Sequence, residues 1–299
     1  MGGISLTSKP AILDLVKKRI IILDGGMGSL LIDQGLPPGM PPEFWNISNP
    51  ENVQACHKNY FDAGSDVVFT NTFGGSRLKL MAHKHGHSIE EYNKKAVELV
   101  KGICPEHGYI AGDIGPSGAF LPPVGTITVE EYFRNFLEQA RYLSDAGVDF
   151  FVVETMVDVK EAEAAVKAIR EISSLPILAS MTYKKTKRGY FTIMGNSVSE
   201  CVKILEEAGA DIVGANCTLG SDEMVDLVPL LKKETNLPIS VKPNAGQPQL
   251  VNGKTIYNTT PQDFTRDIML MIEAGANLVG GCCGSNPEFI KEIAEKVKG

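Results

Sequence analysis

The sequence predicts an α/β protein built as one (β/α)8 barrel. Short runs rich in Val, Ile and Leu recur along the 299 residues, and each is followed by a longer stretch with helical apolar spacing. Eight such runs can be counted, and eight parallel strands are the number that closes a barrel of this type. The predicted strands are residues 20–23, 67–69, 109–111, 150–153, 177–181, 212–215, 239–242 and 278–280.

A short repeat supports the order of elements. The pattern Ala-Gly-x-Asp, or Ala-Gly-x-Asn, stands directly before four predicted strands and ends at Asp66, Asp149, Asp211 and Asn277. Its glycine can take the left-handed backbone conformation that ends a helix before the chain returns to the sheet. Residues able to cap the start of a helix stand at Ser197, Ser221, Thr260 and Asn286.

An open doubly wound sheet has the same alternation of strands and helices and is the main alternative. Its phosphate-binding fingerprint, G-x-G-x-x-G, is not matched by the glycine cluster DGGMG (24–28) after the first strand. The last predicted helix, near residues 286–298, reaches the end of the chain, and no linker or low-complexity segment interrupts it. We therefore expect residues 1–299 to form a single domain, a closed TIM barrel.

Composition places the chain among ordinary globular proteins, with 43% hydrophobic and 22% charged residues. A net charge of −7 opposes binding to nucleic acid, and no long run of Lys and Arg reverses it locally. The N-terminal stretch lacks the pattern of a signal peptide, and its apolar runs are too short to cross a membrane. We expect a cytoplasmic protein with no nucleic-acid partner and no membrane contact.

Cysteine placement gives the first indication of chemistry. Six cysteines are too few for a disulfide scaffold, which leaves metal binding or core packing. Cys217 follows the sixth predicted strand, and Cys282 and Cys283 follow the eighth, so a barrel places all three at its catalytic end. A catalytic zinc takes three protein ligands and keeps a fourth position for substrate. Burial as small core residues is the alternative.

Polar residues at the ends of other strands point to the same mouth. Asp24 follows the first strand, where a turn-capping role is the alternative, and Glu154 ends the fourth, where an unpartnered acid is costly. Asn244 follows the seventh strand, a position that turn residues often occupy. Thr72 and Phe73 follow the second strand and are expected to line the pocket, as is Arg77.

A second metal site is suggested by the alternating histidines His83, His85 and His87. Gly86 and the polar surroundings favour a solvated helix end over metal binding.

The chain resembles the homocysteine S-methyltransferase family from its first predicted strand to its last. The most specific match combines NC after strand six with GGCCG after strand eight. GDIGPSG and NGKTIYNTTPQDF (252–264) most resemble the homocysteine-binding module of cobalamin-dependent methionine synthase. The matching strings are DGGMGS (24–29), TNTFGGSR (70–77), GDIGPSG (112–118), ET (154–155), NCTLG (216–220), PNAGQP (243–248) and GGCCG (280–284).

This resemblance implies a zinc-dependent enzyme that methylates homocysteine to methionine. Cys217, Cys282 and Cys283 would be the zinc ligands and the catalytic residues. Thiolate is the nucleophilic form of sulfur, and a bound zinc ion favours it.

The resemblance also implies how the amino acid is bound. Asp24 and Glu154 would bind the amino-acid end of homocysteine, with Glu154 matching its cationic amine. Gly25 and Gly26 would offer backbone donors, and Asn244 would occupy the open zinc position before homocysteine arrives.

The implied methyl donor is a methylated corrinoid, a methylcobamide carried on another domain or protein, because no corrinoid-binding module follows Gly299. Betaine or S-methylmethionine as donor, or transfer to or from a separate corrinoid protein, remain open alternatives. A zinc-stabilised binding module without turnover is disfavoured, because it would have no use for an open coordination position.

Overall fold

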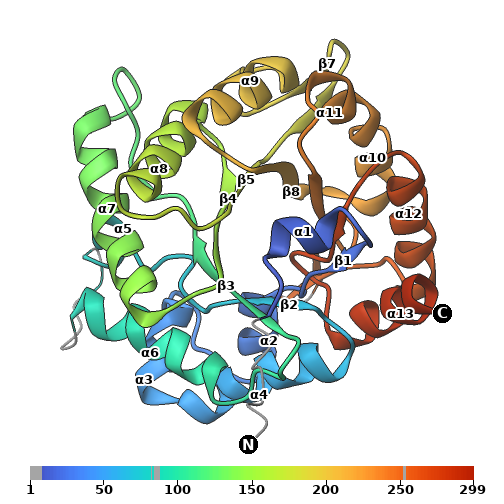
Figure 1. Ribbon diagram of the computed structural model, residues 1–299, viewed down its shortest axis with the longest axis horizontal. Helices are drawn as coiled ribbons and strands as arrows, with labels where there is room; N and C mark the ends of the chain where they lie inside the picture. The colour runs from blue at the N-terminus through green and yellow to red at the C-terminus, as the bar shows by residue number, and fades with distance from the viewer. Residues whose placement is uncertain (1–8, 82, 84–87, 252–253) are drawn as a thin grey trace, which may run out of the picture.

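The computed structural model describes residues 9–81, 83, 88–251 and 254–299 and confirms the predicted barrel (Figure 1). Eight parallel strands follow the order β1-β12-β9-β8-β5-β4-β3-β2, with helices outside them. All eight predicted strands are present, and four extend further toward their carboxyl ends. Their bounds are β1 Ile21–Ile22, β2 Val67–Phe69, β3 Tyr109–Ile114, β4 Phe150–Met156, β5 Ile177–Met181, β8 Ile212–Gly220, β9 Ile239–Asn244 and β12 Leu278–Val279.

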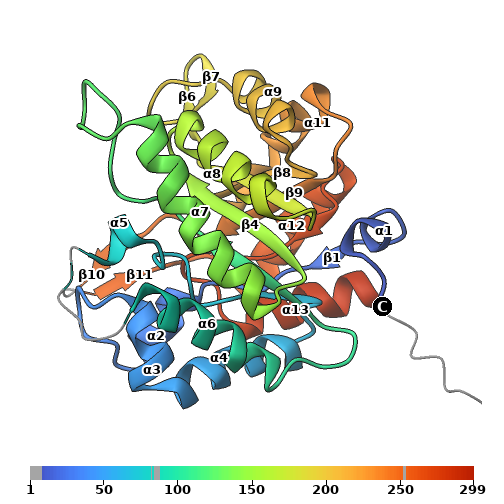
Figure 2. The same cartoon turned by 60° about the vertical axis from the view of Figure 1, so that its left-hand side comes forward.

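Two antiparallel hairpins, β6–β7 and β10–β11, follow β5 and β9 and lie apart from the barrel sheet (Figure 2). Their strands are β6 Lys184–Thr186, β7 Gly189–Phe191, β10 Gln249–Val251 and β11 Lys254–Ile256. The helices are α1 Ile12–Val16, α2 Met27–Asp33, the 3-10 helix η1 Pro42–Phe44, α3 Trp45–Ser48, α4 Pro50–Asp62, α5 Arg77–Leu80, α6 Ile89–Lys101, α7 Val129–Ala146, α8 Val159–Ile172, α9 Val198–Ala208, α10 Ser221–Val225, α11 Val228–Glu234, α12 Pro261–Glu273 and α13 Pro287–Lys298.

The core has two layers because successive strand residues point to opposite faces of the sheet. On β1, Ile21 packs in the cluster inside the barrel, whereas Ile22 packs in the cluster between the sheet and the helices. The inner cluster includes Ile12 and Val16 of α1, which closes the amino-terminal end of the barrel. The opposite end, where the strands finish, is left for polar side chains.

The Ala-Gly-x-Asp repeat ends helices as predicted and also joins strands. Its glycines have positive φ angles, from 80° at Gly147 to 113° at Gly275. In each copy the final residue donates its N–H to the carbonyl of the preceding strand of the barrel and accepts that strand's N–H on its side chain. These pairs are Asp66 with Ile22, Asp149 with Ile110, Asp211 with Ile177, and Asn277 with Ile239.

Three of the four predicted helix caps are confirmed. Ser197, Thr260 and Asn286 each accept a backbone N–H from the first turn of α9, α12 and α13. The prediction at Ser221 was wrong by one residue, because Gly220 is the N-cap of α10. Ser221 instead donates its hydroxyl to Asp267 Oδ2 at 2.7 Å, so the hydroxyl serves a contact between helices.

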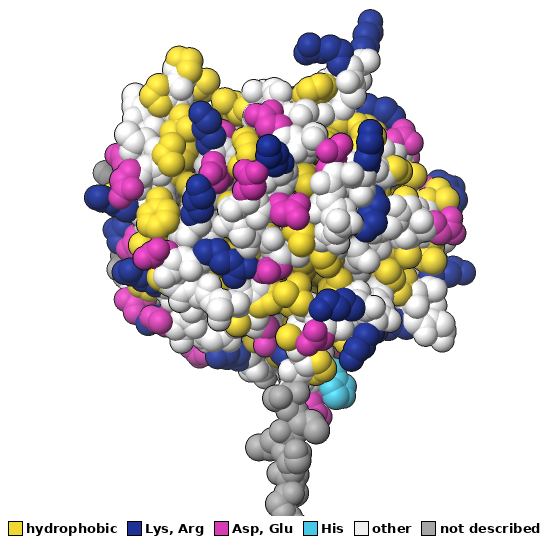
Figure 3. All heavy atoms as spheres, turned by 45° about the horizontal axis from the view of Figure 1, so that its top comes forward, with side chains coloured by type: hydrophobic (Ala, Val, Ile, Leu, Met, Phe, Trp, Pro, Cys, Tyr) yellow, Lys and Arg dark blue, Asp and Glu magenta, His cyan; other side chains and the backbone are white. Residues whose placement is uncertain are grey.

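Acidic and basic side chains are intermixed over the face of the molecule seen in Figure 3. One short basic cluster stands out. Residues 184–188, at the tip of the β6–β7 hairpin, contain four exposed basic side chains among five residues. Among the described residues, no helix is both long and apolar enough to cross a membrane.

Asn277 is the one uncharged residue among the four that end the Ala-Gly-x-Asp repeat, and its side-chain hydrogen bond predicts an effect on stability. Asn277→Ala removes the acceptor that lies 3.0 Å from the Ile239 N–H, so the free energy of unfolding should fall by about 1–3 kcal/mol. Asn277→Asp keeps an acceptor, as in the other three copies, and should stay much closer to wild type. Urea unfolding of the three proteins measures this difference, and equal losses in both variants would refute the role of the acceptor.

Candidate active site

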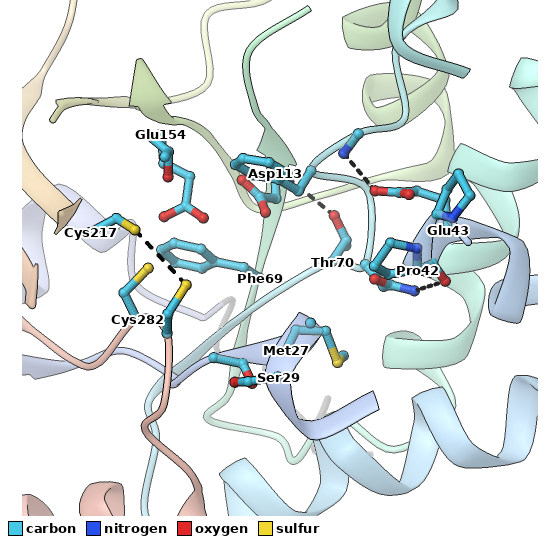
Figure 4. A pocket seen from close by; sticks show the side chains of 18 of the residues that line it. Met27, Ser29, Pro42, Glu43, Phe69, Thr70, Asp113, Glu154, Cys217 and Cys282 are labelled. Atoms are coloured by element: carbon cyan, nitrogen blue, oxygen red, sulfur yellow. Dashed lines mark hydrogen bonds between the residues drawn. The ribbon is translucent and has the colours of Figure 1, made fainter. Parts of the chain in front are cut away.

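A cavity of about 450 Å³ opens at the carboxyl ends of the strands (Figure 4). It brings together most of the predicted site residues: Asp24, Gly25, Gly26, Phe73, Glu154, Cys217, Cys282 and Cys283. It also contains residues that were not predicted, among them Phe69, Asp113 and Lys242. The sulfurs and Glu154 lie at one end of the cavity, and Pro42 and Glu43 lie at the other.

The three predicted cysteines converge. Sγ of Cys217 lies 3.9 Å from Sγ of Cys283, and all three sulfurs lie within 4.8 Å of one another. In a tetrahedral zinc site with metal–sulfur distances of about 2.3 Å, neighbouring sulfurs are roughly 3.8 Å apart. The cluster therefore has dimensions suited to one tetrahedral metal ion.

Cys217 reaches the cavity because β8 is irregular there. The pairing of β8 with β9 shifts register between Asn216 and Gly220. Within that interval, Cys217 and Thr218 have φ angles of 57° and 61°, in the left-handed region that residues other than glycine rarely adopt. Such local strain is often found at functional sites, where surrounding contacts hold it in place.

Cys282 and Cys283 lie in a turn that depends on glycine. Ser285 donates its N–H to the Cys282 carbonyl at 3.1 Å, and Gly284 within this turn has a φ of 81°. A Cβ atom at Gly284 would lie 2.2 Å from the ring of Tyr257. The cysteine pair is thus held by a turn that other residues would distort.

Asn244 lies beside this cluster, although it does not line the cavity. It is buried, and its Oδ1 has no hydrogen-bond partner within the part of the chain that the structure describes. Hydrogen bonds from Cys282 and Cys283, with a further one from Asn244, lower the pKa of Cys217 to about 3. The hydrogen bond to Cys217 is also the largest cause that raises the pKa of Cys282 and of Cys283, so the cluster by itself favours one thiolate, at Cys217, beside two thiols.

A buried ion pair forms part of the cavity wall. Nζ of Lys242 lies 2.6 Å from Asp24 Oδ1, and the other carboxylate oxygen of Asp24 accepts the Phe69 N–H at 2.7 Å. Lys242 also lies 3.6 Å above the ring centroid of Phe69. Burial lowers the pKa of Lys242, but the charges of Asp24 and Glu154 outweigh it and raise the pKa overall. Lys242 is therefore a cation at neutral pH.

Asn216 holds Glu154 and connects two irregular strands. Its Oδ1 accepts the Thr155 N–H at 2.8 Å and its Nδ2 donates to Glu154 Oε2 at 3.2 Å. Thr155 has a φ of 60°, next to a register shift between β4 and β5. Burial raises the pKa of Glu154 to about 7.

The other predictions have mixed outcomes. Phe73 lines the cavity, but Thr72 is buried behind it and donates to the Asp113 carbonyl at 2.7 Å. Arg77 does not line the cavity and pairs with Glu138. His83 lines the cavity, whereas its proposed metal partners His85 and His87 lie outside the described residues.

Comparison with known proteins relates the whole barrel to one family. The family profile described as homocysteine S-methyltransferase matches residues 21–297. Methionine synthases from Mycobacterium tuberculosis and Mycobacterium leprae are each 30% identical over 304 residues, covering 96% of this chain. The chain spans about a quarter of the length of these relatives, because the match covers 25% of each.

A solved structure supports the fold independently. The metallated homocysteine methyltransferase MmuM from Escherichia coli superposes with a TM-score of 0.79 at 22% identity, over 95% of this chain and 98% of its own. Its apo form superposes with a TM-score of 0.74 at 23% identity.

The Asp24–Lys242 pair gives a stability prediction. Lys242→Met leaves a buried carboxylate without its cation, so the free energy of unfolding should fall by about 3–5 kcal/mol. Adding Asp24→Asn removes that charge while keeping an oxygen for the Phe69 N–H, so the double variant should regain much of the loss. Urea unfolding tests this, and a double variant as unstable as the sum of the single variants would contradict it.

Proposed function

The chain belongs to the homocysteine S-methyltransferase family, and on that premise we propose that it transfers a methyl group to the sulfur of homocysteine, giving methionine. The observation that carries this proposal is the cluster of Cys217, Cys282 and Cys283 at the end of a buried cavity. A thiol acceptor needs a site that favours its thiolate, since the thiolate is the nucleophile. The cluster and cavity together support such a site.

We propose zinc as the metal that these cysteines hold. Three thiolates in tetrahedral spacing suit zinc, and the buried Asn244 Oδ1, which has no hydrogen-bond partner among the described residues, supports a role for Asn244 at the fourth position. When bound, zinc supplies Lewis-acid stabilisation of a thiolate. The chain itself fixes the sulfurs through the strained backbone at Cys217 and the turn at Gly284.

The polar wall beside the sulfurs would bind the amino-acid end of homocysteine. Glu154 would receive the cationic amine, and the backbone at Gly25 would face the substrate carboxylate, whereas the Gly26 N–H is already donated to Ser285. Asp24 lines the same wall and adds negative charge to it, while its oxygens already bind Lys242 and the Phe69 N–H.

We propose a methylcobamide as donor, presented by a separate domain or protein. Two observations support it: the two mycobacterial relatives described above are methionine synthases, and this chain matches only a quarter of each. The thiol cluster also needs a reducing compartment to stay reduced, so we place the reaction in the cytoplasm.

A donor assay tests the proposal directly. Zinc-loaded protein and homocysteine are offered methylcobalamin, betaine or S-methylmethionine in separate reactions, and methionine is measured. We expect methionine from methylcobalamin and none above background from the other two donors. Methionine formed from betaine or S-methylmethionine instead would overturn the choice of donor. Methylation of a corrinoid protein from another substrate, with no methionine from any donor, would overturn the direction of transfer.

The role of the cysteines is tested by Cys283→Ala. This variant loses one of three ligands, so it should lose zinc during gel filtration with a chelator and lose methyl transfer to homocysteine. Cys104→Ala, at a half-buried cysteine remote from the cavity, should keep both properties and serves as control. A Cys283→Ala protein that is free of zinc yet fully active would disprove the mechanism.

A further inference from the structure

Asp113 is a cavity residue to which the function described above gives no role. It lies on β3 next to β4, where it pairs in register with Val152, two residues before Glu154. Side chains two residues apart on a strand point to the same face, so both acids face the inside of the barrel. Figure 4 shows the two carboxyl groups at the same end of the cavity.

The backbone of Asp113 is fixed while its carboxylate is unused. Thr70 Oγ1 accepts the Asp113 N–H at 3.1 Å, and Thr72 Oγ1 donates to the Asp113 carbonyl at 2.7 Å. The side chain is only 5% exposed, yet Oδ1 has no hydrogen-bond partner among the described residues. A buried carboxyl oxygen without a partner is costly, and such groups are usually paired.

The charges around the cavity compensate this cost only in part. Asp24, Asp113 and Glu154 are acids of the inner wall, and Lys242 is the one buried cation that faces them in the described part of the protein. Lys242 is bonded to Asp24. Its charge lowers the pKa of Asp113 and of Glu154, but burial outweighs it and raises the pKa of both acids, and neither has a cation bonded to it among the described residues.

We propose that Asp113 is a substrate-binding residue which, together with Glu154, receives the ammonium group of the amino-acid acceptor and selects amino-acid thiols over thiols without an amine. The inference rests on the proposed function, since it concerns the acceptor of that reaction. The inference adds Asp113 to Glu154 as an acid that contacts the amine. Asp24 already binds Lys242, whereas Oδ1 of Asp113 has no hydrogen-bond partner among the described residues.

The selectivity follows because burying the two carboxyl groups costs less free energy beside a thiol that carries an amine than beside one that lacks it. An ammonium group satisfies both carboxyl groups with charge-assisted hydrogen bonds. A thiol that lacks the amine leaves Asp113 Oδ1 without a partner among the described residues and Glu154 with Asn216 alone, and a site built for a hydrogen bond rejects ligands that cannot form it.

Calorimetric titration of zinc-loaded protein with L-homocysteine and with 4-mercaptobutanoate tests this without a methyl donor. The second thiol has the same chain and lacks the amine. Asp113→Asn should weaken homocysteine binding about tenfold to a hundredfold, the loss expected for one hydrogen bond to a charged group. Binding of 4-mercaptobutanoate should change by less than about twofold, because that thiol never used the carboxylate.

Two controls separate a binding role from a structural one. Asp267→Asn changes an aspartate that is also 5% exposed but lies outside the cavity, and it should leave both affinities unchanged. Asp113→Asn should retain zinc and unfold in urea no earlier than wild type, because it removes a buried acid without a partner.

The possible failures are distinguishable. If Asp113→Asn binds homocysteine as tightly as wild type does, or weakens both thiols equally, the inference is wrong while the proposed function stands. If the wild-type protein binds neither thiol, the proposed function fails and the inference fails with it.

Discussion

The barrel closes between β1 and β2 through aspartate side chains as well as backbone groups. Near the amino ends of these strands, Asp66 accepts the Ile22 N–H at 2.8 Å and donates its own N–H to the Ile22 carbonyl at 2.7 Å. Near the carboxyl ends, Asp24 accepts the Phe69 N–H at 2.7 Å. Because β1 has only two residues, these contacts replace much of the ladder that a longer strand would form.

This closure determines the electrostatics of the cavity. Asp24 holds β2 with one carboxylate oxygen and Lys242 of β9 with the other, so a residue that closes the barrel also binds the buried cation. The remaining acids, Asp113 and Glu154, have no cation bonded to them in the described chain, and burial raises the pKa of both despite the nearby charge of Lys242. Closure of the barrel and affinity for a cationic group are therefore linked through the same carboxylate.

The sequence predicted the elements well because each has a local signature. Apolar runs marked all eight strands, and the glycine of the Ala-Gly-x-Asp repeat marked the helix ends that precede four of them. Ser221 was assigned to the wrong position because its partner, Asp267, lies 46 residues away. Local pattern cannot show whether a hydroxyl caps its own helix or bonds to another one.

Only part of the site was predicted, because local pattern does not show which partners a residue has far away in the sequence. The cysteines were found because barrel topology places the ends of all strands at one mouth. Lys242 was included in the seventh strand without a role, since its partner Asp24 lies 218 residues away. Asp113 was noticed only within the string GDIGPSG, because an alternating buried strand gives no sign of which polar residue lacks a partner.

The cavity extends well beyond its sulfur cluster, and this size bears on the donor. The sulfurs and Glu154 lie at one end, whereas the rest of the lining is mixed and includes Met27, Met40 and Pro41 as well as Glu43, Lys79 and His83. A volume of about 450 Å³ lies within the roughly 300–1,000 Å³ of sites that hold drug-sized ligands, and it exceeds what a small amino acid needs. The space beyond the sulfur cluster is large enough to admit part of a bulky donor that approaches from outside the barrel, as the proposed methylcobamide would.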